Sequence, residues 1–442
     1  MGIETEMLRA IKTQWHNVAR GFWFYPGLVA LAFVGLAVAL VELDRGFGMD
    51  GIGIVFDGDA SAARSILSTV AGSLITVAGL AFSITVVTSQ LVSSQFTPRA
   101  IRSFLGDRVS QLLASAFVGI FAYCLLVLRA VRDEDESAAA FVPSLAVSLA
   151  ILLGLVGLVL LLAFIHRITQ LIKVENIAPR IASEALASIK SLYPEPYGKP
   201  AEGTELVSRW ESESEPKVVR PERPGYVQTI ALDELEAALP GSARVHVVVR
   251  PGDYATEESA LARVWPADEA DDGLLERLRE LFSVQSERDV AQDVGFGIRQ
   301  LADIALRAIS PGVNDPTTAV TCIGYLPAIV ERLGGRDSPR VCAVFGTGTV
   351  VVTHEPSFDG FVREAFAEIG RYASADARLA ATLLEALAAV GRAARIAGAH
   401  ERLGSVLAAA EDVALPALED ARTARDRALV EERLTAVRAL AS

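Results

Sequence analysis

The chain contains 442 residues, of which 51% are hydrophobic and 21% are charged, and its mean hydropathy is +0.37. This composition excludes a disordered, collagen-like or disulfide-stapled chain. It also disfavours an ordinary soluble enzyme, because so much apolar surface needs an apolar solvent. We therefore expect a membrane-spanning block joined to a soluble block.

The cysteines and histidines form no recognisable site. Cys124, Cys322 and Cys342 include no CxxC pair, which fits free thiols in a reducing compartment. The histidines are scattered without an HxxxH spacing, so no metal site is expected. No cofactor is expected either.

Four stretches are long and apolar enough to cross a bilayer, which takes about 20 mostly apolar residues. They are Phe22–Leu43, Ile66–Val92, Leu112–Val131 and Phe141–Ile165. Nine Lys and Arg residues flank these stretches on one side and four on the other. Positive charge stays on the cytoplasmic side, so we expect a multi-pass membrane protein with both termini in the cytoplasm. Residues 1–21 are predicted to form an amphipathic helix in the inner interface.

The second stretch carries small and hydroxyl residues along one helical face. At spacings of three and four these residues are Ser65, Thr69, Gly72, Thr76, Gly79 and Ser83, and the same register continues to Gln90. Two interpretations stay open: the stripe lines a water-filled pore, or it is a seam where membrane helices pack closely. The cores of the four stretches hold no ionisable residue, which disfavours an ion-coupled transporter or pump.

Arginines flank the stripe at both ends. Arg64 lies near its predicted outer mouth, and Arg99 and Arg102 lie near its inner mouth, in a segment read as a short amphipathic elbow. Positive mouths favour anions, although flanking arginines are also ordinary interface residues.

The net charge comes entirely from the later part of the chain. Residues 1–180 hold 13 basic and 13 acidic residues, so the remainder holds 41 − 13 = 28 basic and 54 − 13 = 41 acidic ones. An acidic soluble part argues against nucleic acid as a partner. An acidic vestibule would favour cations, whereas arginines at the pore mouths would favour anions, so the sequence leaves the ion selectivity open.

The expected fold class is a four-helix transmembrane domain at 22–165 plus a cytoplasmic α+β domain at 225–442. Residues 166–190 are predicted to continue from the fourth span as a juxtamembrane helix, followed to residue 224 by an exposed, flexible Pro/Glu-rich linker. Residues 225–266 are predicted to form a small β module, and 272–442 to be mainly helical with a C-terminal helical bundle, whose last helix is expected at Pro416–Leu440.

One polar motif stands out in the soluble part, at residues 287–318. It contains Asp289, Asp293, Arg299, Asp303, Arg307, Asn314 and Asp315. Asp303 can pair with arginines four residues away on either side, and Asp315 followed by Pro316 is typical of a helix start running to about Leu333. The motif is read as a structural helix–turn–helix, with a ligand site as the alternative.

Three segments carry a resemblance to a known family. They read SSQFTPRAIRSFL at 93–105, QDVGFGIRQLADIALRAISPGVNDPTTA at 292–319, and PSFDGFVREAFAEIGRYA at 356–373. Together they resemble the bacterial membrane-protein family catalogued as domain of unknown function 2254. The resemblance implies an inner-membrane protein and no established activity.

The leading functional hypothesis is a homo-oligomeric ion channel that passes small ions through a neutral pore lined by the second stretch, with the cytoplasmic domain as inner vestibule. The protein is not expected to be an enzyme. Two rival hypotheses are a membrane-anchored sensor or scaffold that binds a ligand or partner, and a membrane enzyme or lipid-handling protein.

Overall fold

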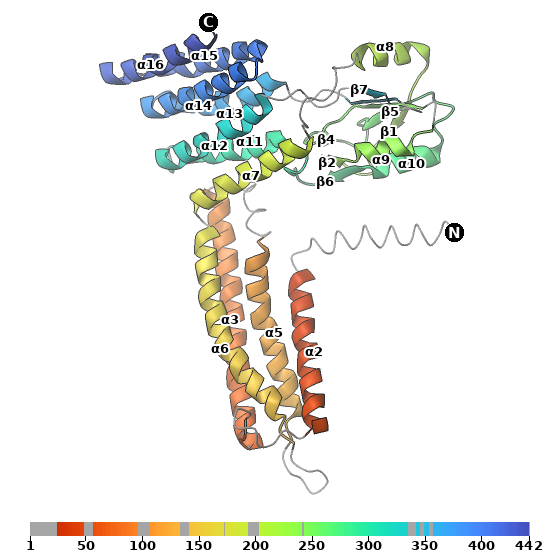
Figure 1. Ribbon diagram of the computed structural model, residues 1–442, viewed down its shortest axis with the longest axis vertical. Coiled ribbons are helices and arrows are strands. Elements are labelled where there is room, and N and C mark those ends of the chain that lie inside the picture. The colour runs from red at the N-terminus through yellow and green to blue at the C-terminus, as the bar shows by residue number, and fades with distance from the viewer. Residues whose placement is uncertain are drawn as a thin grey trace. The chain divides into compact units, whose positions relative to one another are not determined.

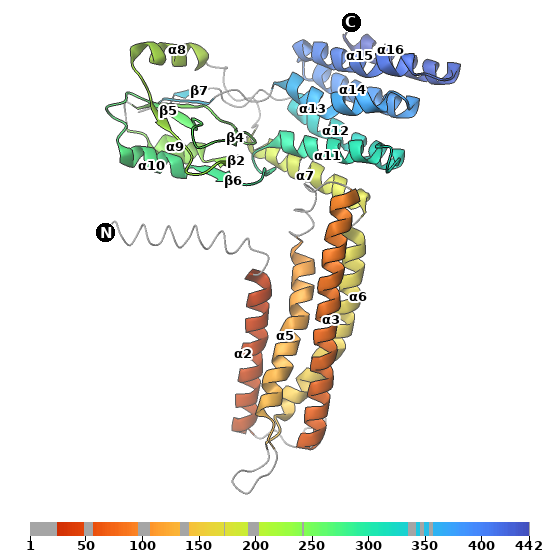
Figure 2. The same cartoon turned by 180° about the vertical axis from the view of Figure 1, so that it is seen from behind.

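The computed structural model describes residues 24–47, 56–95, 107–132, 141–171, 173–192, 203–240, 243–334, 342–344, 349–352 and 357–441. The predicted interfacial helix at 1–21 and the candidate mouth residues Arg99 and Arg102 lie outside these ranges. The chain divides into two compact units, one built from residues up to Asn176 and one from Ile177 onward. We call them the membrane unit and the α+β unit, and Figures 1 and 2 label their elements.

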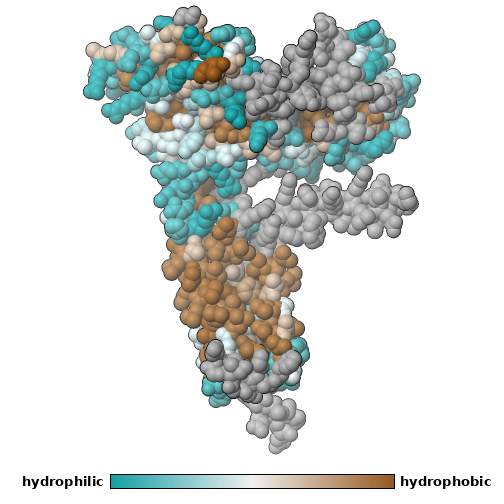
Figure 3. Space-filling view, viewed as in Figure 1, coloured by the Kyte–Doolittle hydropathy of each residue, from teal (hydrophilic) through white to brown (hydrophobic). Residues whose placement is uncertain are grey.

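The membrane unit consists of four long helices within the described residues. They are α2 (Phe24–Phe47), α3 (Ala60–Gln95), α5 (Arg108–Ala130) and α6 (Ser144–Leu171). Each holds a stretch long and apolar enough to cross a membrane, and Figure 3 shows a brown apolar belt over these helices. The prediction of four membrane helices is confirmed.

Side-chain caps set the starts of three of these helices. Asp59 accepts the backbone N–H of Ala62 at the start of α3, and Asp107 accepts that of Ser110 at the start of α5. The start of α6 is capped from another helix, because Asp44 of α2 accepts the N–H groups of Leu145 and Ala146. These carboxylates satisfy donors that a helix leaves without a partner in its first turn.

Close packing in the membrane unit depends on glycines. A side chain at Gly119 of α5 would collide with the Phe33 ring of α2. Added Cβ atoms at Gly154 and Gly157 of α6 would lie 3.2 Å from Val70 and 2.9 Å from Leu74 of α3. Small residues let membrane helices approach in this way.

The α+β unit contains two small sheets. The first has the strand order β1-β5-β3-β8-β7 and the second β4-β2-β6, and the one parallel pair among the described strands is β3 with β8. The strands are β1 (Lys217–Val219), β2 (Gly225–Ile230), β3 (Arg244–Val247), β4 (Tyr254–Ala255), β5 (Ala262–Trp265), β6 (Phe282–Gln285), β7 (Cys342–Val344) and β8 (Thr349–Val352). The helices α8 (Gly203–Glu213), α9 (Leu232–Ala238) and α10 (Asp272–Glu280) accompany them. Alternate strand residues such as Val245 and Val247 enter a shared apolar core.

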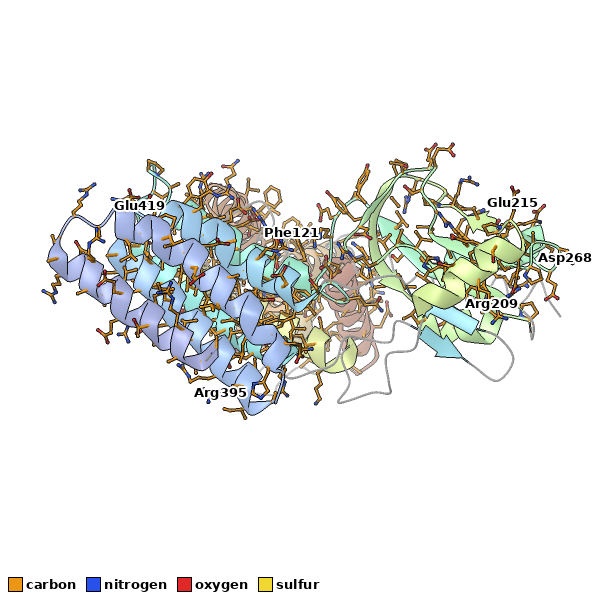
Figure 4. The ribbon with its side chains drawn as sticks, turned by 90° about the horizontal axis from the view of Figure 1, so that it is seen from above. Phe121, Arg209, Glu215, Asp268, Arg395 and Glu419 are labelled. Atoms are coloured by element: carbon orange, nitrogen blue, oxygen red, sulfur yellow. The ribbon has the colours of Figure 1, made fainter. Side chains whose placement is uncertain are left out.

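The rest of the α+β unit is helical. Its helices are α7 (Val174–Leu192), α11 (Val294–Ala308), α12 (Pro316–Gly334), α13 (Phe358–Ala373), α14 (Ala377–Ile396), α15 (Leu403–Glu419) and α16 (Ala424–Ala441). Helices α12, α14 and α16 form one row, and α11, α13 and α15 form a second row packed on it (Figures 1 and 2). Charged side chains such as Arg395 and Glu419 cover the outside of this array (Figure 4).

Several expectations about the α+β unit are wrong in detail. The linker is not exposed throughout, because α8 and β1 lie within it, and Trp210 and Val219 are buried. The β module is not confined to 225–266, since its sheets recruit strands from both sides of that range. The juxtamembrane helix does not continue from the fourth span, because α6 ends at Leu171 and α7 begins at Val174.

The C-terminal helix boundary also differs from the expected one. Pro416 was expected to begin a helix but lies near the end of α15. The chain breaks instead at 420–423, where the Thr423 hydroxyl accepts the Asp426 N–H at 3.1 Å and donates to its carboxylate at 2.8 Å. This reciprocal cap favours a helix start more strongly than the proline does.

Candidate functional site

Every member of the predicted stripe lies on α3 and is exposed in the single chain. The residues are Ser65, Thr69, Gly72, Thr76, Gly79, Ser83 and Gln90. We call this surface the α3 polar face. Its glycines are open: a Cβ added at Gly72 or Gly79 meets nothing within 4 Å. The stripe is therefore not a packing seam inside one copy of the chain.

The buried side of α3 points the opposite way. Its members include Ala63, Leu67, Leu74, Ala81 and Val92. With 3.6 residues per turn, the centre of this side lies about 170° around the helix from the centre of the α3 polar face. Helix α3 thus packs on its neighbours through one side and directs the polar face away from them.

The outward side of α6 has a different composition. Leu152, Leu155, Leu158, Val159 and Leu162 are all exposed there, with Leu158 at 61% and Leu162 at 70%. Large apolar side chains of this kind suit contact with lipid tails, whereas small hydroxyl side chains suit contact with another helix or with water. Helix α3 also exposes large apolar side chains beside its polar face, such as Leu80 and Phe82. The contrast with α6 therefore lies in the polar stripe, which α6 lacks on its outward side, and it indicates different surroundings for the stripe and for the leucines of α6.

The hydroxyl groups of the α3 polar face bond to their own helix. Thr69 donates to the Ser65 carbonyl at 2.7 Å, and Thr76 donates to the Gly72 carbonyl at 2.8 Å. Beside them, Ser73 donates to the Thr69 carbonyl at 2.7 Å. Because each hydroxyl oxygen can still accept a hydrogen bond, the face suits either a dry helix contact or a file of water.

Of the three candidate mouth arginines, the structure describes Arg64. Its guanidinium donates to the Val131 carbonyl at 3.4 Å, just after α5 ends. At the other end of α5, Arg167 of α6 binds Asp107 through two hydrogen bonds. Burial alone would raise the pKa of Asp107, but the bonds from Arg167 and Ser110 lower it to about 2.

In the α+β unit, the predicted motif separates into three local clusters. The first surrounds Asp293, which is buried at the start of α11. One carboxylate oxygen accepts the Phe296 N–H at 3.0 Å and the other pairs with Arg288 at 2.7 Å. A side chain at Gly252, whose φ is +96°, would collide with this carboxylate. Burial raises the pKa of Asp293, against the opposing effect of the Arg288 and Arg250 guanidiniums.

This cluster fastens the strands to the start of α11. Ile230 at the end of β2 donates its N–H to the Gln292 side chain at 2.8 Å, next to Asp293. In the same segment the Asp289 carboxylate accepts the Ala291 N–H at 3.0 Å, as a local turn. These contacts account for Asp293 and Asp289 without a ligand.

The second cluster joins α11 to α13. Arg299 pairs with Asp303 at 2.6 Å, as predicted, and also with Glu368 at 2.5 Å and Glu364 at 3.8 Å. Although burial opposes it, these carboxylates raise the pKa of Arg299. Arg307 lies in the last turn of α11, where its carbonyl accepts the Ser310 hydroxyl.

The third cluster is the turn into α12. Asn314 adopts a φ of +50°, which asparagine tolerates better than most residues. The Asp315 carboxylate accepts the N–H of Thr318 at 3.1 Å and its hydroxyl at 2.6 Å, and these bonds lower its pKa. The predicted helix start at Pro316 is confirmed.

Sequence reasoning missed the partners that complete these clusters. Arg288, five residues before Asp293, carried no periodic signal. Glu364 and Glu368 did carry one, since they lie four residues apart on one side of α13, within the third segment that suggested the family. Two of the three family segments therefore meet through Arg299.

A membrane unit of four apolar helices joined to an α+β unit defines a multi-span membrane protein with a large extramembrane part. The chain belongs to the family of predicted membrane proteins designated DUF2254, which matches residues 19–389. It is 30% identical over 407 residues to uncharacterized proteins of Mycobacterium bovis and Mycobacterium tuberculosis, a match that covers 88% of this chain and 75% of theirs. No solved structure matches the chain.

Proposed function

We propose that the protein is a homo-oligomeric channel of the bacterial inner membrane in which α3 lines a narrow, uncharged pore. The observation that supports this most directly is the direction of the α3 polar face, which points away from its own membrane unit. Copies arranged around an axis would bring these faces together and take them out of lipid. A leucine-rich face such as that of α6 would remain against the lipid tails.

The chemistry of the face fits a pore without fixed charge. Hydroxyl groups at Thr69 and Thr76 keep one donor engaged with the helix and leave lone pairs for water or a passing cation. Open glycines at Gly72 and Gly79 remove side-chain bulk between them. In this arrangement both termini lie in the cytoplasm, and the acidic α+β unit forms the inner vestibule.

Reconstitution tests conduction. The purified full chain in liposomes should release trapped potassium or chloride, and Thr76→Leu should abolish this flux without changing the oligomer measured by cross-linking. Loss of the oligomer would instead identify the face as a helix seam. The absence of flux for both ions, under varied voltage and tension, would refute the channel.

Thiol accessibility tests whether water reaches the face. In a chain whose three cysteines are replaced, Thr76→Cys should react with a membrane-impermeant thiol reagent, because the reactive thiolate needs water. Leu158→Cys on the lipid-facing side of α6 is the matched control and should stay unmodified. Equal protection of both cysteines in an intact oligomer would contradict a water-filled pore.

A further inference from the structure

A second exposed helix face, in the α+β unit, lacks charge. It consists of Thr317, Val320, Thr321, Gly324 and Ala328 on α12, which share one side by their spacing. We call it the α12 face. Val320 is 41% exposed there, and Val313 in the preceding turn is 44% exposed. The opposite side of α12 is buried in the helical array through residues such as Ile323 and Leu326.

The absence of charge is unusual for a helix at the edge of this array. The sequence from Pro316 to Val330 contains no Asp, Glu, Lys or Arg, and the carboxylate of the preceding Asp315 is engaged by Thr318. Helix α16 stands at the other end of the same row and carries charged residues throughout. A helix that lacks a charged side is ordinarily covered on all sides. The surface over α12 is accordingly pale in Figure 3.

Two details indicate that the cover is another protein surface rather than water. The Thr321 hydroxyl already donates to the Thr317 carbonyl at 3.0 Å, so it does not depend on solvent. A Cβ added at Gly324 meets nothing within 4 Å, so packing within this chain gives no reason for glycine there. Glycine inside a helix costs about 1 kcal/mol relative to alanine. A closely approaching second helix supplies the missing reason.

The size of the α12 face favours an occupant that is already nearby. From Thr317 to Ala328 it extends about 16 Å along the helix, at 1.5 Å per residue. With a helix diameter near 10 Å, each partner would bury on the order of 200 Å², far below the roughly 800 Å² per partner of stable complexes. A freely diffusing protein would not be retained. A second copy held in the same membrane needs much less contact area, because its effective concentration is high.

The charge distribution also favours a second copy. Residues after 180 carry 41 acidic and 28 basic side chains, so two α+β units have net charges of the same sign and repel each other. They can approach where neither presents a charge. The structure therefore points to a contact between copies, and we propose that α12 packs face to face against α12 of a second copy. This inference rests on the homo-oligomer in the proposed function and adds its extramembrane contact.

Disulfide cross-linking in native membranes tests this contact. In the cysteine-free full chain, Gly324→Cys should convert most of the protein to a covalent dimer on mild oxidation, because facing small residues bring backbones to disulfide distance. Ala428→Cys, exposed on α16, is the matched control and should stay monomeric. A monomeric Gly324→Cys chain, or one cross-linked only to other proteins, would overturn the proposal.

Charge insertion provides a second readout. Val320→Glu should abolish the cross-link at position 324, whereas Ala428→Glu should leave it intact, although both add one carboxylate to an exposed helix position. Unchanged cross-linking in Val320→Glu would contradict the contact. Thr76→Cys separates this proposal from the channel: a cross-link at position 76 without one at 324 refutes the α12 contact alone. A cross-link at 324 without ion flux refutes the channel alone.

Discussion

Asp293 offers the sharpest test of how the α+β unit is held together. Its two carboxylate oxygens have separate tasks: one accepts the Phe296 N–H at the start of α11, and the other pairs with Arg288. Asp293→Ala removes both contacts and leaves the guanidinium without this partner. Asp293→Asn keeps an oxygen for the cap and removes the charge.

The expected magnitudes differ between the two variants. Loss of a helix cap costs about 1 kcal/mol. Loss of the pair with Arg288 adds about 1–2 kcal/mol, reduced from the fully buried case because Arg288 is 31% exposed. We therefore expect Asp293→Ala to lower the free energy of unfolding of this region by about 2–3 kcal/mol. For Asp293→Asn we expect the free energy of unfolding to fall by about 1 kcal/mol or less, because removing a buried charge also removes its desolvation cost.

Hydrogen exchange of the α11 amides, measured by mass spectrometry on the full chain in nanodiscs, reports the free energy of local opening of this helix. About 2–3 kcal/mol corresponds to roughly 30- to 150-fold faster exchange. Asp289→Ala, in the same segment, is the control and should change exchange several-fold at most. Unchanged exchange in Asp293→Ala would refute the structural role and favour the ligand-site alternative. Equal effects of Ala and Asn would show that the charge, not the cap, dominates.

Three further predictions follow from contacts at single residues. Because its folded pKa is lowered, Asp315 contributes stability above about pH 4 that disappears as the pH falls through the folded pKa; the thermal midpoint of Asp315→Asn should therefore depend less on pH between 2.5 and 5. Gly119→Ala should destabilise the membrane unit by about 1–3 kcal/mol through overpacking, seen as a lower midpoint in detergent, whereas Gly72→Ala should not; equal midpoints would contradict the packing of α2 on α5. Arg167→Ala should lower the free energy of unfolding by about 1–2 kcal/mol, because it leaves the buried Asp107 carboxylate without its cation although Arg167 itself is 40% exposed, and Asp107→Asn in the same chain should recover most of the loss; a double variant no better than the single one would refute this pairing.

Much of the fold was predictable because its signals are local. The four membrane helices follow from hydropathy alone, and the start of α12 follows from Asp315 and Pro316 at adjacent positions. The cap formed by Thr423 and Asp426 is equally local in sequence. The start of the last helix was nevertheless predicted at Pro416, because a proline is typical of a first helical position.

The remaining features depend on contacts between distant residues. Strands such as β4, of two residues, carry no periodicity of their own and exist because β2 lies beside them. Glu368 meets Arg299 across 69 positions of sequence. The stripe on α3 was visible in the sequence. Its direction was not, because it depends on which side of α3 packs on α6, and the structure shows that this side carries Val70 and Leu74.

The cap that Asp44 places on α6 also bears on how the protein is made. Its carboxylate lies in the first membrane helix, and the N–H groups it accepts belong to Leu145 and Ala146, 101 and 102 residues later. During synthesis those donors do not yet exist when the first helix reaches the bilayer. The last membrane helix therefore supplies two hydrogen-bond donors to the first one, and a chain that stalls before residue 144 lacks these two bonds, which distinguishes it from a finished chain.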